Sequence, residues 1–178
     1  MKRILTLILI ASLLLVGCEK LNQQKKVISP VVDNTSSVKE THIEQPLIEL
    51  EIVRGEYRAI WKRSYNYDKP MLIDNLIHWK EFLKNYPAQF TNRDVLQQDY
   101  NDDFFKHSVV YAYIKSEGSG SIKLKVKRAE LYGDKLRLFM ERSVPEIGTA
   151  DMATRICLFG IKKDKIKNVK AVEAIILE

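Results

Sequence analysis

Strict alternation of apolar and polar residues recurs in several short segments of the chain. In residues 48–52, three apolar residues alternate with two glutamates, which is the period expected for a strand with one buried face. Residues 56–61 predict a second strand that pairs with the first, with Gly55 near the turn between them. Residues 70–73 predict a third, short strand before the pattern changes.

A helical period replaces this alternation between residues 74 and 86. Apolar side chains recur there at helical spacing and form one stripe, which consists of Leu76, Trp79, Leu83 and Tyr86. Asp74 or Asn75 can cap the start of this helix, and Pro87 stops it because proline has no amide proton and its ring clashes with the preceding turn. A second, short helix is expected over 94–100.

The rest of the chain predicts strands. Residues 108–115 are apolar at most positions, which is typical of a central strand buried on both faces. A loop is expected over 145–153. Further strands, separated by this loop and by short turns, are expected over 121–131, 135–142, 154–161 and 169–177.

Many strands joined by short turns, with few helices, favour one fold class. We predict an α+β fold, mainly an antiparallel β-sheet with one or two helices packed against it. Residues 47–178 form this single α+β domain. A domain of that length buries roughly two thirds of its unfolded surface, which is enough for one hydrophobic core.

The amino terminus breaks the pattern with a mainly apolar run over residues 4–16, behind Lys2 and Arg3. A helix of about 13 residues reaches about 20 Å at 1.5 Å per residue. The hydrocarbon core of a bilayer is about 30 Å thick, so the run is too short to span it comfortably. A basic start followed by a short apolar run is typical of a signal peptide.

The end of this run is specific. Leu15-Val16-Gly17-Cys18 resembles the bacterial lipobox, in which a small residue precedes a cysteine. The resemblance implies that residues 1–17 are a lipoprotein signal peptide, cleaved between Gly17 and Cys18. It also implies a diacylglyceryl group on the Cys18 thiol, whose acyl chains, such as palmitate, hold the secreted protein on the outer face of the bacterial cell membrane. Two acyl chains anchor a protein stably, whereas one does not. An uncleaved anchor helix and an ordinary secretory signal are the alternatives.

Residues 18–46 differ in composition from both neighbours. Glutamine, lysine, asparagine, serine and threonine dominate, and phenylalanine, tyrosine and tryptophan are absent. Such a segment cannot bury enough apolar surface to offset the entropy of ordering it. We therefore expect the lipidated Cys18 to be followed by a flexible tether.

Turn and strand motifs in the second half of the chain follow a particular order. Residues 100–105, Tyr-Asn-Asp-Asp-Phe-Phe, precede an apolar strand, and residues 118–122, Gly-Ser-Gly-Ser-Ile, precede a basic hairpin. Residues 144–149, Val-Pro-Glu-Ile-Gly-Thr, and residues 151–153, Asp-Met-Ala, precede the last pair of strands. Over roughly residues 70–177 this order resembles the C-terminal domain of PrcB-like proteins, a family of protease-complex components. The resemblance implies an accessory part of an exported or lipid-anchored protein, in the type case a lipoprotein that supports a surface protease complex. It carries over no catalytic residue.

The positive net charge of the chain points to a basic surface. The chain of 178 residues has a formal net charge of +6. Lys123, Lys125 and Lys127 alternate with apolar residues and so share one face of a strand, and Arg137 lies across the hairpin from them. This basic stripe is either a solvated face whose lysines discourage edge pairing, or a binding surface for anionic lipid or envelope polymer. It lacks the interleaved aromatic residues that favour single-stranded nucleic acid, so we expect no nucleic acid partner.

The loop that leads into the strand at 154–161 is a second candidate for a binding site. Glu146, Thr149, Asp151 and Arg155 bring charged and polar groups close together along the chain, and loops often carry function. The alternative is a well-packed connection in which Asp151 accepts hydrogen bonds from nearby backbone amides.

Residue types that perform catalysis or bind metals are scattered. The three histidines have no second ligand at metal spacing. Asp102 and Asp103 are adjacent and therefore point apart, which suits a loop or a helix cap. Cys157 lies in an apolar segment and is expected to be a small buried side chain. We predict no catalytic residue, no metal and no cofactor, and we do not expect an enzyme.

These observations favour a binding role. We predict a monomeric, membrane-anchored extracytoplasmic lipoprotein whose domain is a non-catalytic binding or accessory part for another envelope protein, such as a surface protease. Its partners would be the membrane, through the diacylglyceryl group on Cys18, and that protein. One alternative is an electrostatic binder of anionic envelope polymer or lipid surface. Another is an unrecognised hydrolase, which would require a pocket with converging titratable groups.

Overall fold

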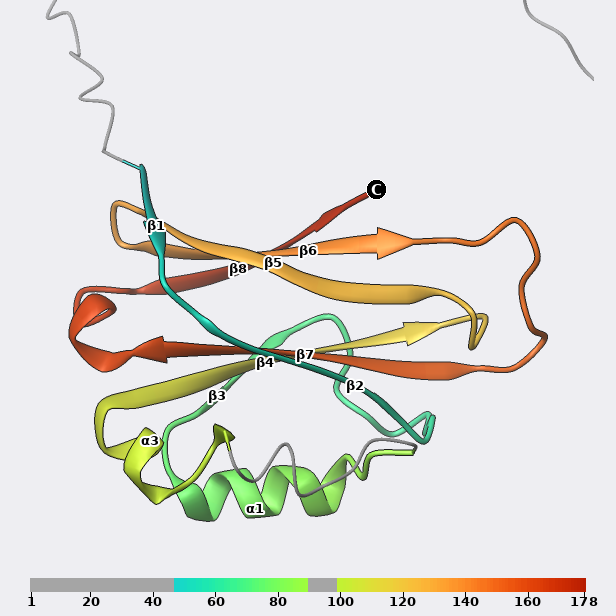
Figure 1. The fold of residues 1–178 in the computed structure, drawn as a ribbon, viewed down its shortest axis with the longest axis horizontal. Helices are drawn as coiled ribbons and strands as arrows, with labels where there is room; N and C mark the ends of the chain where they lie inside the picture. The colour runs from blue at the N-terminus through green and yellow to red at the C-terminus, as the bar shows by residue number, and fades with distance from the viewer. Residues whose placement is uncertain (1–46, 90–98) are drawn as a thin grey trace, which may run out of the picture. The chain divides into compact units, whose positions relative to one another are not determined.

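The computed structural model describes residues 47–89 and 99–178, and in these ranges eight strands form two sheets of four strands each (Figure 1). Sheet A has the order β1-β5-β6-β8, with β1 at Leu47–Leu50, β5 at Lys123–Tyr132, β6 at Lys135–Ser143 and β8 at Ala171–Leu177. Sheet B has the order β2-β7-β4-β3, with β2 at Val53–Ala59, β7 at Ala153–Lys162, β4 at Ser108–Glu117 and β3 at Pro70–Ile73. The helices are α1 at Leu76–Asn85, α3 at Asp102–His107 and a 3-10 helix, η1, at Lys163–Lys165.

This architecture confirms the predicted α+β class. The named strands pair antiparallel, except that β6 and β8 run parallel. The six strands expected from residue 70 onward all form, close to their expected ends. The strands divide between two packed sheets, and α1 and α3 lie on the outer side of sheet B (Figure 1).

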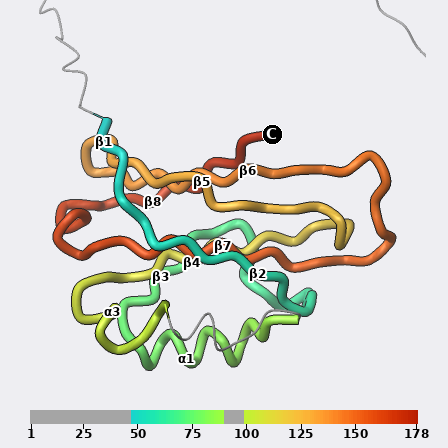
Figure 2. The backbone as a smooth tube through the Cα atoms, in the orientation of Figure 1, coloured from blue at the N-terminus to red at the C-terminus, as the bar shows by residue number. Residues whose placement is uncertain are grey.

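The first strand does not form a hairpin with the second. Only Glu51 and Ile52 separate β1 from β2, and the chain crosses there from sheet A to sheet B (Figure 2). The expected turn near Gly55 is therefore wrong, because Gly55 lies inside β2 opposite Leu158 of β7. Glycine is needed there for close packing, since a Cβ would lie 2.8 Å from the hydroxyl of Tyr100.

The crossing leaves part of β5 without a neighbouring strand on one side. β1 pairs only with residues 129–132 of β5, and no other strand in the described ranges pairs with β5 on that side. A β-bulge between Val126 and Arg128 interrupts β5 beside the point where β1 departs, and bulges bend a strand and increase its twist. Residues 123–128 therefore present an unpaired side, which we call the free edge of β5.

Two hydrophobic cores follow from the layered arrangement. One lies between the sheets, and the other lies between sheet B and the helices. On β4, Val109, Tyr111 and Tyr113 belong to the first core, whereas Val110 and Ile114 belong to the second. This confirms the prediction of a central strand buried on both faces. Each large apolar side chain buried in this way contributes about 1.5–3 kcal/mol.

Helix α1 covers one side of sheet B as its apolar stripe predicts. The Asn75 side chain caps its first turn by accepting a hydrogen bond of 2.8 Å from the amide of His78. Trp79 is 1% exposed. Its ring stacks on Phe82 at 5.8 Å and contacts Tyr100 at 5.0 Å between centroids. These contacts fix the helix on the second core.

Helix α3 is an element that the pattern of the sequence did not predict. The Asn101 side chain caps it, and Asp102 and Asp103 occupy its first turn, where negative charge is favourable. The two aspartates therefore lie in the first turn of a helix, next to the capping residue, and do not cap it themselves. The helix predicted over 94–100 falls mainly on residues 90–98, which lie outside the described residues.

The predicted signal peptide, the lipidated Cys18 and the tether also lie outside the described residues. In the part of the chain that the structure describes, no helix has the length and apolarity needed to cross a membrane.

Candidate functional site

A groove of about 480 Å³ opens between β2 and the free edge of β5. Its charged lining consists of Glu56, Arg58, Lys123, Lys125 and Arg155. We call it the basic groove. The groove exists because the chain leaves sheet A after β1 and continues in sheet B as β2, so that no strand from the described part of the chain fills the row beside residues 123–128.

Strand register brings the two arginines together. Arg58 on β2 lies directly opposite Arg155 on β7, and partners in a register project to the same face. Burial and the neighbouring charge of Arg58 lower the pKa of the Arg155 guanidinium, because both disfavour the charged form. The Nε atom of Arg155 is buried and has no hydrogen-bond partner among the described residues.

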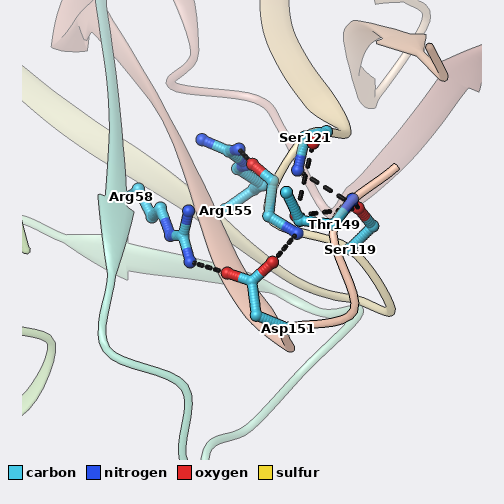
Figure 3. Close-up of polar contacts among 7 residues, drawn as sticks. Arg58, Ser119, Ser121, Thr149, Asp151 and Arg155 are labelled. Carbon is cyan, nitrogen blue, oxygen red and sulfur yellow. Dashed lines mark hydrogen bonds and ion pairs between the residues drawn. The ribbon is translucent and has the colours of Figure 1, made fainter. Parts of the chain in front are cut away.

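Asp151 joins the loop before β7 to β2 and to the β4–β5 hairpin (Figure 3). Its carboxylate accepts hydrogen bonds from Arg58 at 2.5 Å and from the amide of Gly120 at 3.1 Å. Hydrogen bonds from Thr149, Arg58 and Gly120 lower the pKa of Asp151 to about 2, because each stabilises the ionised form. We call this arrangement the Asp151 latch. Asp151 does accept a hydrogen bond from a backbone amide, but this amide belongs to Gly120, 31 positions earlier in the chain, and not to the loop itself.

Three hydroxyl groups connect the same hairpin and loop (Figure 3). The Ser119 oxygen accepts hydrogen bonds from the amides of Thr149 at 2.9 Å and Ser121 at 3.2 Å. The Ser121 hydroxyl donates to the Thr149 hydroxyl at 3.2 Å. These contacts hold the hairpin and the loop in one position at the end of the basic groove.

Glu56 occupies the free edge of β5. Its Oε1 atom accepts a hydrogen bond of 2.6 Å from the backbone amide of Val126. The thiol of Cys157 donates weakly to the carbonyl of Leu124, at 3.7 Å. Side chains of sheet B therefore satisfy backbone groups that a neighbouring strand would otherwise pair.

The predicted basic stripe is divided in the structure. Lys123 and Lys125 are exposed, line the basic groove and have no acidic partner among the described residues. Lys127 forms an ion pair of 3.2 Å with Glu141. Arg137 lies 3.4 Å from Glu173 and stacks over Tyr132, with 4.6 Å between the guanidinium carbon and the ring centroid.

The loop candidates are divided as well. Thr149, Asp151 and Arg155 meet at the end of the groove. Arg155 reaches it by donating to the carbonyl of Gly120. Glu146 is exposed and makes no hydrogen bond or ion pair with another described residue.

Sequence reasoning missed Arg58, Glu56, Ser119 and Ser121 as parts of this site. Arg58 and Glu56 alternate with apolar residues in β2, which indicates only that they share a strand face. Their position opposite β7 follows from the strand order, which local sequence does not contain. The serines were visible only as part of a turn.

Other chemically distinctive residues have structural partners. His78 lies 2.7 Å from Asp74 at the start of α1, and Cys157 is fully buried. Burial raises the pKa of the Cys157 thiol. Within residues 47–89 and 99–178, no group of three His, Cys, Asp or Glu side chains is arranged to hold a metal ion.

Comparisons with known proteins add no family to this geometry, so the resemblance to PrcB-like domains stays a prediction. No model of a protein family, no curated protein and no solved structure matches the chain.

Proposed function

We propose that the chain is a lipid-anchored lipoprotein of the bacterial cell envelope whose domain binds another envelope protein without catalysing a reaction. The basic groove carries this proposal. It places four basic side chains and one carboxylate around about 480 Å³ of space, which is a typical size for a binding site. The partner segment would therefore present acidic groups.

The groups around the groove support binding rather than proton transfer. The pKa of Asp151 is about 2, whereas an efficient general base has a pKa near the working pH. Ser119, Ser121 and Thr149 bond to one another and to backbone amides. Such contacts suit a rigid wall for a ligand, and rigid walls reduce the entropy lost on binding.

The place of the groove in the fold also suits an anchored binding domain. Leu47, where the described chain begins, pairs with Tyr132 at one end of β5. Lys123, in the groove, is at the other end of this ten-residue strand, which at about 3.3 Å per residue is roughly 30 Å long. A partner in the groove would leave the start of the domain free. The proposed anchor on Cys18 would then hold the complex at the outer face of the membrane.

One observation favours the alternative of an electrostatic binder for anionic polymer or lipid. Lys123 and Lys125 are exposed without an acidic partner in the described ranges. Binding through exposed charges alone weakens steeply as the salt concentration rises. At an ionic strength of 0.1 M, counterions largely screen charges that lie more than about 10 Å apart. Binding in a formed groove depends less on salt.

Site-specific cross-linking in intact cells tests the proposal. A photoreactive amino acid replaces Lys123 at the groove in the full-length lipoprotein, and in a second strain it replaces Lys167, an exposed residue beyond η1. We expect one defined protein to be cross-linked from position 123 and not from position 167. Arg155→Gln in the same chain should remove most of that product.

Other outcomes would contradict the proposal. Cross-linking from both positions to many proteins would show that the groove has no specific partner. Products that contain only lipid or polymer, and that disappear in high salt, would support the electrostatic alternative instead.

A further inference from the structure

We infer that the basic groove takes an extended acidic peptide segment, which adds a strand to the free edge of β5 and displaces the carboxylate of Glu56. The inference rests on the proposed function and specifies the partner's chemistry. Three observations support it: the vacant row beside β5, the position of Glu56, and the charge around the row.

The vacant row has the shape of a missing strand. β1 runs antiparallel beside residues 129–132 and then leaves sheet A, so on that side residues 123–128 have no neighbouring strand among the described residues. Pairing with β1 ends at Ala129, two positions from the bulge at Lys127 in the ladder between β5 and β6. Exposed strand edges are recognised by extended peptides through backbone hydrogen bonds. The groove opens on this row at residues 123–125, since Leu124 and Lys125 of β5 and Arg58 of β2 are among the residues that line it.

Glu56 already makes the contact that an added strand would make. Its carboxylate accepts a hydrogen bond of 2.6 Å from the amide of Val126. In a strand pair, a peptide carbonyl would accept that bond instead. Glu56 is itself exposed, so its side chain can turn toward water without breaking a core. It therefore acts as an internal competitor for the same amide.

The charges around the row select acidic side chains. Lys123 and Lys125 belong to β5, the strand beside which the peptide would bind, and Arg58 and Arg155 belong to the opposite wall of the groove. Successive side chains of an extended peptide point to opposite sides, so a peptide with acids at alternate positions would direct one row of carboxylates at these bases. Asp151 neutralises Arg58 in part, which leaves the groove with net positive charge.

The test uses the full-length lipoprotein in detergent micelles and a short peptide of alternating glutamate and valine. A second peptide of the same sequence carries N-methyl groups on alternate amides, which keeps the charges and blocks strand pairing. We expect the first peptide to bind, and the second to bind at least about tenfold more weakly, since tenfold corresponds to about 1.4 kcal/mol, near the value of one or two backbone hydrogen bonds. The amide resonance of Val126 should shift on binding of the first peptide.

Three variants separate the contributions of single side chains to the affinity for the peptide. Glu56→Ala removes the competitor, and we expect the first peptide to bind several-fold more tightly. Glu49→Ala, which removes another exposed acid from the preceding strand, should leave the affinity unchanged. Arg155→Gln should weaken binding about tenfold, as expected for loss of a charged contact that the bound peptide would cover.

Several results would overturn the inference. Equal binding of the two peptides would show a site for charge alone, and unchanged affinity in Glu56→Ala would show that Glu56 does not compete. Inorganic phosphate that displaces the peptide at equal concentration would indicate a small-anion site, and vesicles of phosphatidylglycerol that do so would indicate a lipid surface. Each of these leaves the proposed function standing if the cross-link from position 123 persists. Absence of that cross-link defeats the proposed function itself.

Discussion

Arg142 on β6 donates to both carboxylate oxygens of Glu117 at the end of β4, from Nε at 3.0 Å and from Nη2 at 2.9 Å. The side chain of Glu117 is 3% exposed, whereas that of Arg142 is 22% exposed. The pair joins sheet A to sheet B next to the hairpin that forms one end of the basic groove.

Removal of Arg142 should therefore destabilise the domain strongly. In Arg142→Met, the buried carboxylate of Glu117 loses its partner, and we expect the free energy of unfolding to fall by about 3 kcal/mol. Lys127→Met, which breaks an exposed pair with Glu141, should cost less than about 1 kcal/mol. Urea denaturation of both variants checks the difference, and equal losses would show that the inter-sheet pair is not important.

The Asp151 latch should make the stability of the domain depend on pH in the acid range. The pKa of Asp151 is lowered from 3.8 to about 2 in the folded chain, so its stabilising contribution is complete above the unfolded value and is lost as the pH falls toward 2. Asp151→Asn should therefore be less stable than the wild type at pH 7. The difference in free energy of unfolding between the two proteins should become smaller between about pH 4 and pH 2. The urea midpoint measured across this range tests the sign. A difference that stays constant down to pH 2 would contradict the latch.

Two nearby glycines provide a matched comparison. A Cβ at Gly120 would overlap the carboxylate of Asp151 and lie 2.6 Å from Arg58, whereas a Cβ at Gly118 would meet nothing within 4 Å. We expect Gly120→Ala to displace Asp151 and to cost about 1 kcal/mol, the low end for overpacking because the displaced groups are side-chain ends. Gly118→Ala should change stability by less than about 0.5 kcal/mol. Gly120→Ala should also lose the acid dependence described for Asp151, which a comparison of urea midpoints at pH 7 and at low pH would detect.

The proposed anchor depends on Cys18. Cys18→Ala should release the protein from membranes and abolish incorporation of labelled palmitate, because the thiol is the attachment point for the lipid. Cys157→Ala removes the other cysteine of the chain and should keep both properties. Fractionation of cells and fluorography measure the two outcomes. Labelled Cys18→Ala protein, or a mature chain that still contains residues 1–17, would show that the lipobox interpretation is wrong.

Much of the fold could be predicted because its elements carry local signals. The helix at α1 has a cap at Asn75 and one apolar stripe, and β4 is apolar on both faces. The division into two sheets was not predictable, because it depends on the direction that the backbone takes at Ile52, after β1. Alternation continues through that crossing, and Gly55 resembles a turn residue although it serves close packing with Tyr100.

The candidate site was predictable only in part, for the same reason. Asp151 and Arg155 belong to one loop and its following strand, so their proximity is local. Arg58 lies 93 positions before Asp151 along the chain, and only the pairing of β2 with β7 brings the two together. Glu56 reaches Val126 across sheets, which no pattern within β2 indicates.

Two charge reversals test the binding role of the basic groove most directly. On β5, Lys125→Glu changes a residue that lines the groove, and as a control Lys167→Glu changes an exposed residue beyond η1, outside the groove. The measurement is the yield of the partner protein cross-linked from position 123 in intact cells. We predict that Lys125→Glu lowers the yield about tenfold or more, since like charges placed opposite each other cost several kcal/mol, and that Lys167→Glu leaves it nearly unchanged. Equal yields from the two variants would contradict a partner bound in the groove.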